Sequence, residues 1–293
     1  MASINHKFFL SVLFFIIKLV IKHPSMLLFF LLFPAGWYGY EVFIARPALN
    51  FQGVPQAQSW LSPSTWSRTL RSDAFLVGYS DIQGNPLWVT YKIKALDKKT
   101  KSLKRPSRFK SDWRGIKTVT HKDYTHSGYD RGHMAPNNAI SKLYGKNAQL
   151  ETFIMTNITP QKPNLNRNLW RRLESTGVNY FTQLSDGVWV TTGPIFKDSK
   201  TYLNNASTVV IPDAFYKIFA IQSKQGNPKF LAFLVPQTVK GNEPLTQFVV
   251  SIDTIEAATG LDFFHELEDS LENKLEAEIN RKNWPLTRNK KNN

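Results

Sequence analysis

The stretch Tyr129-Asp130-Arg131-Gly132-His133-Met134-Ala135-Pro136-Asn137 places an arginine and a histidine two positions apart, with a glycine between them. Because side chains alternate between the two faces of a β-strand, a strand here would point Arg131 and His133 to the same side. Gly132 allows another segment of backbone to approach closely. Pro136 ends the strand pattern and suits the first turn of a helix. One side chain of such a pair can hold a phosphate while its neighbour moves a proton, which suits phosphodiester hydrolysis.

Two further blocks follow along the chain. The second runs from Thr156 to Trp170 (Thr-Asn-Ile-Thr-Pro-Gln-Lys-Pro-Asn-Leu-Asn-Arg-Asn-Leu-Trp) and continues to Leu173-Glu174. The third comprises Val250–Glu256 and Thr259–Phe264. In this order and at this spacing, the three blocks resemble the DNA/RNA non-specific endonucleases, the endonuclease G-like ββα-metal nucleases. The resemblance extends from about residue 74 to about residue 267, which is most of the chain.

The periodicity of the remaining sequence predicts alternating strands and helices. We expect strands at 75–79, 86–93, 153–156, 188–192, 208–211, 216–221 and 230–235, and helices at 137–152, 166–184, 245–258 and 261–283. This mixture favours an α+β domain built on a mainly antiparallel sheet. The resemblance implies the ββα-metal nuclease fold, in which a central sheet is flanked by helices.

Composition limits the kinds of chemistry and of partner. The 293 residues include no cysteine, which excludes disulfides, cysteine-ligated zinc and thiol catalysis. A net charge of +15 favours a polyanionic partner such as nucleic acid or an anionic membrane surface. Many of the cations fall in one segment, which we call the basic stretch: Lys98, Lys99, Lys101, Lys104, Arg105, Arg108, Lys110, Arg114 and Lys117. Beside a phosphate-handling motif, this stretch predicts a surface that binds the phosphate backbone, although a solvated lysine-rich loop has the same composition.

The N-terminal region contains two apolar runs, at 8–21 and 26–45. The second has the length of a membrane-spanning helix and ends near the aromatic residues Trp37, Tyr38 and Tyr40, as interfacial segments often do. We therefore expect a hydrophobic anchor in residues 1–45, a linker at 46–73, the endonuclease domain at 74–284 and a basic polar tail at 285–293. The catalytic domain would be exported, in the periplasm or outside the cell. A cleaved signal peptide is the alternative for the anchor, and the first run could be a second span or an interfacial helix.

Histidine and arginine have distinct expected roles in the motif. A neutral imidazole near its normal pKa can activate water around neutral pH, so we expect His133 to be the general base. A hydrogen-bonded core histidine is the alternative. We expect Arg131 to contact the phosphate, because its planar guanidinium stays charged and donates to oxygen; the alternative is an ion pair with Asp130. Asp130 itself is expected to fix local geometry.

The resemblance implies one metal ligand and two supporting residues. It assigns a hard cation, Mg²⁺ or Mn²⁺, to Asn166, which could instead cap a helix. It also carries over Asn157, which would order a loop or bind water or phosphate, and Glu174. Eight helical residues rise about 12 Å, so Glu174 would not bind the same ion as Asn166 directly. It would instead hold metal-bound water or position the asparagine, unless it forms a surface ion pair with Arg171 or Lys162.

The resemblance also implies an upstream phosphate-binding arginine in the basic stretch. Arg105 and Arg108 both qualify, and we favour Arg108. The expected protein is a membrane-anchored, Mg²⁺-dependent endonuclease that cuts DNA and RNA without sequence preference, and a homodimer is among its expected assemblies. The alternatives are a membrane-tethered, non-catalytic nucleic-acid-binding protein and a phosphodiesterase that acts on lipid or another small substrate.

Overall fold

The computed structural model describes residues 6–97, 99–197, 199–204, 206–223, 226–282 and 284–286. Lys98 of the basic stretch and residues 287–293 of the expected tail lie outside this range. The chain divides into two units, Met1–Ala48 and Leu49–Asn293. Each unit is described by itself below.

The first unit is helical. It consists of α1 (His6–Lys22), α2 (Ser25–Tyr40) and the π-helical turn η1 (Glu41–Ala45), with His23 and Pro24 between the two α-helices. One continuous helical span, Leu28–Leu49, has 22 residues and a mean hydropathy of 1.4. By length and composition it could cross a membrane, and a signal sequence near an N-terminus would have the same properties. The expected apolar N-terminal helix is therefore present.

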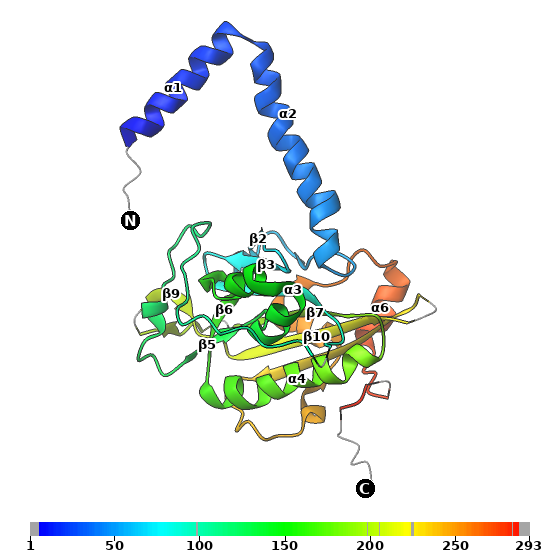
Figure 1. The fold of residues 1–293 in the computed structure, drawn as a ribbon. Helices are drawn as coiled ribbons and strands as arrows, with labels where there is room; N and C mark the ends of the chain where they lie inside the picture. The colour runs from blue at the N-terminus through cyan, green and yellow to red at the C-terminus, as the bar shows by residue number, and fades with distance from the viewer. Residues whose placement is uncertain are drawn as a thin grey trace. The chain divides into compact units, whose positions relative to one another are not determined.

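The second unit is built around a seven-stranded sheet in which every neighbouring pair is antiparallel (Figure 1). In spatial order its strands are β12 (Val249–Val250), β11 (Pro228–Pro236), β10 (Ala214–Gln222), β7 (Val188–Ile195), β4 (Asn85–Ile93), β3 (Phe75–Ser80) and β2 (Arg68–Arg71). The four strands β10, β11, β7 and β4 are buried along nearly their whole length because both faces of the sheet are covered. The expected mainly antiparallel α+β fold is confirmed.

Helices cover both faces of this sheet. On one face, α3 (Asn137–Thr152), η6 (Leu165–Trp170) and α4 (Arg171–Asn179) share a core with Phe215 and Phe219 of β10. On the other, α5 (Ile252–Thr259) and α6 (Asp269–Ala277) pack against the alternate residues Tyr216, Ile218 and Ala220. The period-two alternation along β10 thus separates two hydrophobic cores.

Short elements complete the unit. Three two-stranded ladders pair β1 (Gln56–Ala57) with β13 (Leu261–Asp262), β5 (Asp130–His133) with β6 (Ile158–Gln161), and β8 (Tyr202–Leu203) with β9 (Ala206–Val210). Single 3₁₀ turns are η2 (Pro47–Leu49), η3 (Pro63–Thr65), η4 (His121–Tyr124), η5 (Met155–Asn157), η7 (Phe181–Gln183) and η8 (Leu245–Phe248). Within residues 46–73, for which we expect a linker, β2 forms the edge strand of the large sheet.

Several secondary-structure expectations differ from the structure. The helix expected at 166–184 is π-helical over η6, and its α-helical part, α4, ends at Asn179. The strand expected at 153–156 lies instead at β6, after the turn η5. Within 245–258, where we expect one helix, the α-helical part is α5. The Ser251 hydroxyl caps the start of α5 by accepting the Thr254 backbone N–H. The helix expected at 261–283 begins only at α6. Gly260 adopts a left-handed conformation (φ 67°) that ends α5, and β13 then pairs with β1 and buries Leu261.

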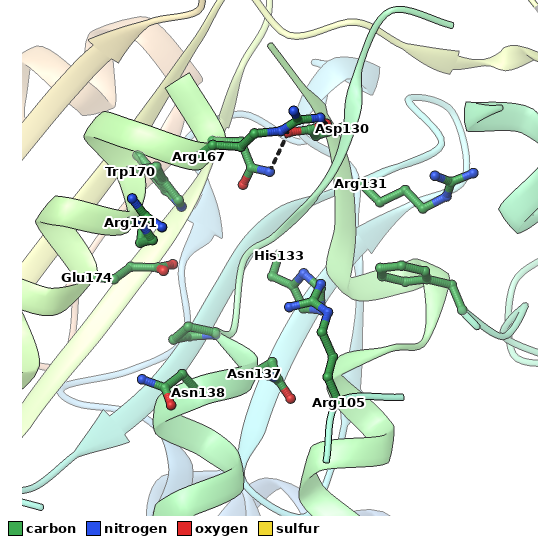
Figure 2. Close-up of a pocket in the computed structure, with 13 residues that line it drawn as sticks. Arg105, Asp130, Arg131, His133, Asn137, Asn138, Arg167, Trp170, Arg171 and Glu174 are labelled. Atoms are coloured by element: carbon green, nitrogen blue, oxygen red, sulfur yellow. Dashed lines mark hydrogen bonds and ion pairs between the residues drawn. The ribbon is translucent and has the colours of Figure 1, made fainter. Parts of the chain in front are cut away.

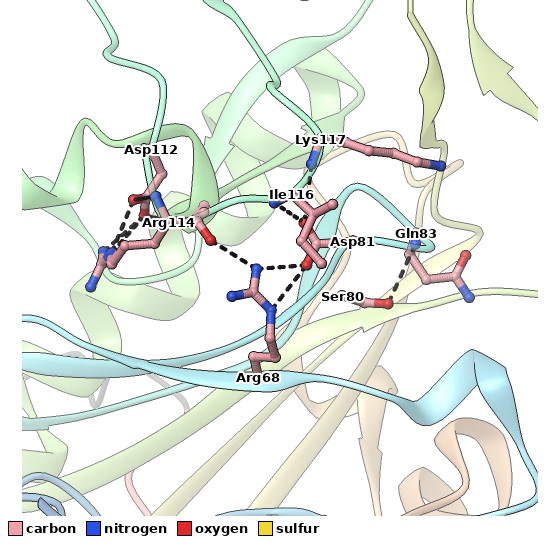
Figure 3. Close-up of polar contacts among 9 residues, drawn as sticks. Arg68, Ser80, Asp81, Gln83, Asp112, Arg114, Ile116 and Lys117 are labelled. Atoms are coloured by element: carbon pink, nitrogen blue, oxygen red, sulfur yellow. Dashed lines mark hydrogen bonds and ion pairs between the residues drawn. The ribbon is translucent and has the colours of Figure 1, made fainter. Parts of the chain in front are cut away.

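Charged side chains bind the C-terminal end of the basic stretch to the edge of the seven-stranded sheet (Figure 3). Arg68 of β2 pairs with Asp81 at 2.6 Å and also donates to the Arg114 carbonyl at 2.9 Å. Asp81 Oδ1 accepts the Ile116 backbone N–H at 2.7 Å. Arg114 donates to both carboxylate oxygens of Asp112. These contacts hold residues 112–117 in place. The segment that precedes them in the chain borders the site described next.

Candidate active site

A cavity of about 510 Å³ opens beside β5 and the first turn of α3 (Figure 2). Its walls come from the basic stretch, from β5, from the start of α3 and from η6 with α4. The residues that line it are Arg105, Phe109, Asp130, Arg131, His133, Pro136, Asn137, Asn138, Asn166, Arg167, Trp170, Arg171 and Glu174. Four of the six residues expected at the site therefore lie around one space: His133, Arg131, Asn166 and Glu174.

The turn that follows His133 is held by Asn157. This side chain is 1% exposed, and its oxygen accepts the Ala135 backbone N–H at 2.8 Å. Its amide nitrogen donates to the carbonyl of Ala135 at 3.1 Å and to that of Thr152 at 3.0 Å. All its polar atoms are thus used on backbone groups, and it does not line the cavity. Of its expected roles, the ordering of a loop agrees with this geometry.

Position 132 needs a glycine because a neighbouring side chain, rather than a neighbouring backbone segment, lies close to it. A Cβ atom at this position would collide with the side chain of Gln161, which packs over β5 from the neighbouring strand β6. The expectation of a close approach is correct, but the expected partner, another backbone segment, is wrong. Any larger residue at position 132 would have to displace the buried side chain of Gln161.

The imidazole of His133 lies between two aromatic rings and an arginine. Its ring centroid is 5.4 Å from that of Phe109 and 4.9 Å from that of Phe153. Burial, together with the charge of Arg105, lowers the pKa of His133 to about 3. A hydrogen bond with the Arg131 backbone raises this pKa and offsets part of the decrease. The imidazole is therefore neutral at pH 7, with a lower pKa than expected from the sequence. Its Nε2 makes no hydrogen bond to any described residue.

Arg131 borders the cavity but is held by backbone and hydroxyl oxygens. Its Nη2 donates to the His121 carbonyl at 2.7 Å and to the Thr125 hydroxyl at 3.1 Å. Figure 2 shows the guanidinium extended away from His133. The alternative ion pair with Asp130 is not what the structure shows, because the Asp130 carboxylate is bound by other residues.

Asp130 orients Asn166. Its Oδ2 accepts from the Asn166 amide nitrogen at 2.9 Å and from Arg167 Nε at 2.8 Å, while its Oδ1 accepts from Arg167 Nη2 at 2.6 Å. Burial raises the pKa of Asp130, but these hydrogen bonds outweigh it, so the net pKa is lowered and the carboxylate stays ionised. Because the amide nitrogen of Asn166 is bound to Asp130, the amide oxygen is the atom of this side chain that could bind a cation in the cavity. Asn166 lies inside η6, whose N-cap position is Asn164, so it is not a helix cap.

Glu174 faces the cavity from α4, with a side chain that is 21% exposed. Behind it, the fully buried Lys217 places its Nζ 3.8 Å from Glu174 Oε1. Burial raises the pKa of Glu174 to about 7, and the charge of Lys217 opposes this rise. Lys217, rather than the expected Arg171 or Lys162, is thus the charged neighbour of Glu174. It was missed in the sequence, although a lysine in the middle of the apolar run Ala214–Gln222 was the signal that could have revealed it.

The upstream arginine that we favour from the sequence, Arg108, does not line the cavity; the other candidate, Arg105, does. The guanidinium carbon of Arg105 lies 5.0 Å from the Phe153 ring centroid, close to His133. An isolated β-bridge between Lys110 and the segment after α3 fixes the path of the chain near Arg105. The Lys110 backbone N–H donates to the Phe153 carbonyl at 2.9 Å. Local sequence does not contain this long-range contact.

The donor set suits a hard divalent cation. The amide oxygen of Asn166 is the candidate ligand, and oxygen ligands are those that Mg²⁺ and Mn²⁺ prefer. The Glu174 carboxylate borders the same cavity, where it can accept hydrogen bonds from water. Mg²⁺ also needs few protein ligands, because it keeps several waters. The described residues that line the cavity include two carboxylates, Asp130 and Glu174, and Asp130 is already bound to Arg167 and Asn166. The site therefore fits one cation better than two.

Comparisons with known proteins bear on the family and the fold of the chain. The family model described as DNA/RNA non-specific endonuclease matches residues 61–270. Human "Endonuclease G, mitochondrial" is 29% identical over 203 residues, which make up 65% of this chain and 67% of that protein. Nuclease C1 of Cunninghamella echinulata var. echinulata is 31% identical over 233 residues, 74% of this chain and 91% of that one. A crystal structure of the EndoG/EndoGI complex covers 74% of this chain and 89% of its own, with a TM-score of 0.60 and 24% identity.

Proposed function

Because the chain belongs to the DNA/RNA non-specific endonuclease family and is thus a phosphodiester hydrolase, we propose that it cuts DNA and RNA with a divalent cation and with His133 as the general base. One observation carries the proposal. The cavity is lined both by His133, a neutral imidazole whose buried Nε2 has no partner among the described residues, and by Asn166, whose amide nitrogen is bound to Asp130. A proton acceptor beside a cation ligand is what hydrolysis of a phosphodiester requires.

The proposed mechanism assigns one step to each group. His133 Nε2 accepts the proton of the water that attacks phosphorus. Arg105, and Arg131 at the rim, stabilise the negative charge that builds up on the phosphoryl oxygens. Asn166 would hold the cation, which would supply positive charge for the phosphate and the leaving oxygen. Glu174 accepts hydrogen bonds from water in the cavity, and Asn157 acts as a positioning residue by holding the turn after His133.

Substrate binding is proposed to depend on charge rather than on base identity. The chain carries a net charge of +15, and the cavity is lined by Arg105, Arg131, Arg167 and Arg171. Contacts of this kind address the phosphate backbone, so they confer affinity that decreases with salt and little sequence preference. DNA and RNA are accordingly the proposed partners, and the homodimer stays a prediction.

The N-terminal unit is proposed to anchor the protein. The apolar span Leu28–Leu49 supports this, and the basic residues Lys18 and Lys22 before it favour a cytoplasmic N-terminal side and an exported catalytic unit. A topology reporter fused after Asn293 is expected to report an exported C-terminus. A cytoplasmic signal would overturn the proposed orientation while leaving the nuclease proposal intact.

The function is tested with the full-length chain in detergent, supercoiled plasmid and a structured RNA. With Mg²⁺ we expect nicked and then linear plasmid and shortened RNA, and with excess chelator we expect neither. Salt-sensitive retention of uncut plasmid would instead identify the tethered non-catalytic binding protein. Activity confined to a lipid phosphodiester would point to the small-substrate phosphodiesterase.

The two upstream arginines provide a matched pair of substitutions. Arg105→Ala is expected to lower kcat/KM about 10–100-fold, because a charge-assisted hydrogen bond contributes roughly 1.5–3 kcal/mol. Arg108→Ala removes the same charge outside the cavity and should change kcat/KM by less than about threefold at physiological salt. Plasmid cleavage rates at fixed ionic strength measure both. Equal losses in the two variants would show that net charge, and not position, matters.

Glu174 is expected to set the acidic limb of the pH–rate profile. Its pKa is raised to about 7, so as the pH falls through this value the carboxylate takes up a proton and the rate declines. His133, with a pKa of about 3, stays neutral over the same range and adds no limb there. Glu174→Gln should therefore be slower but nearly independent of pH from about pH 5 to about pH 8. A limb near pH 7 that persists in this variant would assign it to another group.

A further inference from the structure

Lys217 occupies a position where the sheet would otherwise be apolar. It lies in the centre of β10, between Phe215 and Phe219 on the face covered by η6 and α4, and its side chain is 0% exposed. In register it neighbours Thr192 on β7 and Phe233 on β11. Burying an ammonium group costs several kcal/mol unless it is paired, so a lysine here needs a compensating partner.

The surroundings of the ammonium group lead to the active site. Its Nζ donates to the Tyr91 hydroxyl at 3.2 Å, lies 4.5 Å from the Trp170 ring centroid, and is 3.8 Å from Glu174 Oε1. These groups come from β4, η6 and α4, the elements packed against this part of β10. Among them Glu174 is the one with an opposite charge, and its carboxylate also borders the catalytic cavity. The lysine thus lies in the core beside the sheet and next to a carboxylate that lines the catalytic cavity.

We propose that Lys217 is a positioning residue of the active site, which from within the core keeps the Glu174 carboxylate ionised and in place beside the cavity. The inference deepens the proposed function, on which it rests, because it assigns Glu174 a supporting partner. It does not make Lys217 a catalytic residue, since its ammonium group has no exposed surface and does not touch the cavity.

The physical reason is the balance between desolvation and charge. Burial alone favours the neutral acid form of Glu174, and a cation within about 4 Å opposes this effect. Conversely, burial lowers the pKa of Lys217 to about 8, and the carboxylate of Glu174 counteracts it. Without the lysine, Glu174 would hold its proton to higher pH and would donate, rather than accept, a hydrogen bond towards the cavity.

The test replaces Lys217 with a neutral side chain of similar length. In Lys217→Met we expect the pKa of Glu174, followed by carbon NMR of its carboxyl group, to rise by at least about 1. The acidic limb of kcat/KM should move to higher pH by the same amount, while KM at high pH changes little. Lys217→Arg should restore both towards the wild-type values. In a Glu174→Gln background, Lys217→Met should cause no further change in the profile.

A merely structural role predicts something else. In that case Lys217→Met would change the melting temperature but leave both the carboxyl titration and the acidic limb where they are, and the inference would be overturned. If this variant does not fold, Glu174→Gln supplies the reciprocal measurement: the pKa of the Lys217 ammonium group should fall, and an unchanged value would also overturn it. Both titrations are informative even if the wild-type protein cuts no nucleic acid, so failure of the proposed function is seen separately.

Discussion

His133→Ala is expected to lower kcat on supercoiled plasmid by about 10²–10⁴-fold, which is the usual contribution of a positioned general base. Its lowered pKa keeps this imidazole in the neutral form, which has a proton-accepting nitrogen, although it also makes the ring a weaker base than a free histidine. The buried Nε2 has no hydrogen-bond partner among the described residues. Alanine removes the acceptor but leaves the arginines and the cation ligand, so KM should change much less than kcat. Single-turnover cleavage with saturating Mg²⁺ separates the two effects.

A second histidine provides the matched control. His121 stacks on Phe109 with a ring-centroid distance of 5.7 Å, and burial also lowers its pKa, but it does not line the cavity. Arg131 uses the His121 carbonyl, which alanine retains. His121→Ala should therefore stay within a few-fold of wild type. Similar losses in both variants would mean that the aromatic packing around Phe109, and not proton transfer, is what His133 supplies.

Asn166→Ala is expected to be the second most damaging change. Loss of the amide oxygen should weaken cation binding and lower the rate at millimolar Mg²⁺ by at least about 100-fold, because a bound cation contributes several kcal/mol to the transition state. Asn166→Asp retains an oxygen ligand, but it places a second carboxylate against Asp130 and should recover only part of the activity. Rates measured across a Mg²⁺ titration distinguish weaker binding of the cation from the loss of a catalytic group.

Two further variants define the role of Asn166. Asn168→Ala changes an exposed asparagine of the same turn, η6, that does not border the catalytic cavity, and it should leave the Mg²⁺ dependence unchanged. Asp130→Ala removes the acceptor that orients the Asn166 amide, and it is expected to weaken cation affinity by roughly 10–100-fold. An Asn166→Ala enzyme that needs no more Mg²⁺ than wild type would contradict the ligand assignment.

Local patterns predicted some elements closely and failed at others for a physical reason. The sequence predicts the helix at 137–152 with its observed outer bounds, because Pro136 precedes its first turn, but not the kink at Gly145, whose φ of 86° is non-helical. The helix expected from residue 261 was wrong over its first eight residues. There the left-handed Gly260 and pairing of β13 with β1 outweigh helix propensity, and β1 lies some two hundred positions away. Contacts at such separations do not appear in any short window of sequence.

The sequence by itself determined the family and the strongly positive net charge. Its motifs also named four residues that the fold brings around one cavity: Arg131, His133, Asn166 and Glu174. Their environment was decided by the tertiary structure. It placed Arg105 at the cavity, set Lys217 behind Glu174 and lowered the pKa of His133. The reason is that residue types are written in the covalent order, whereas pKa values and partners depend on burial and on charges that folding brings together from distant segments.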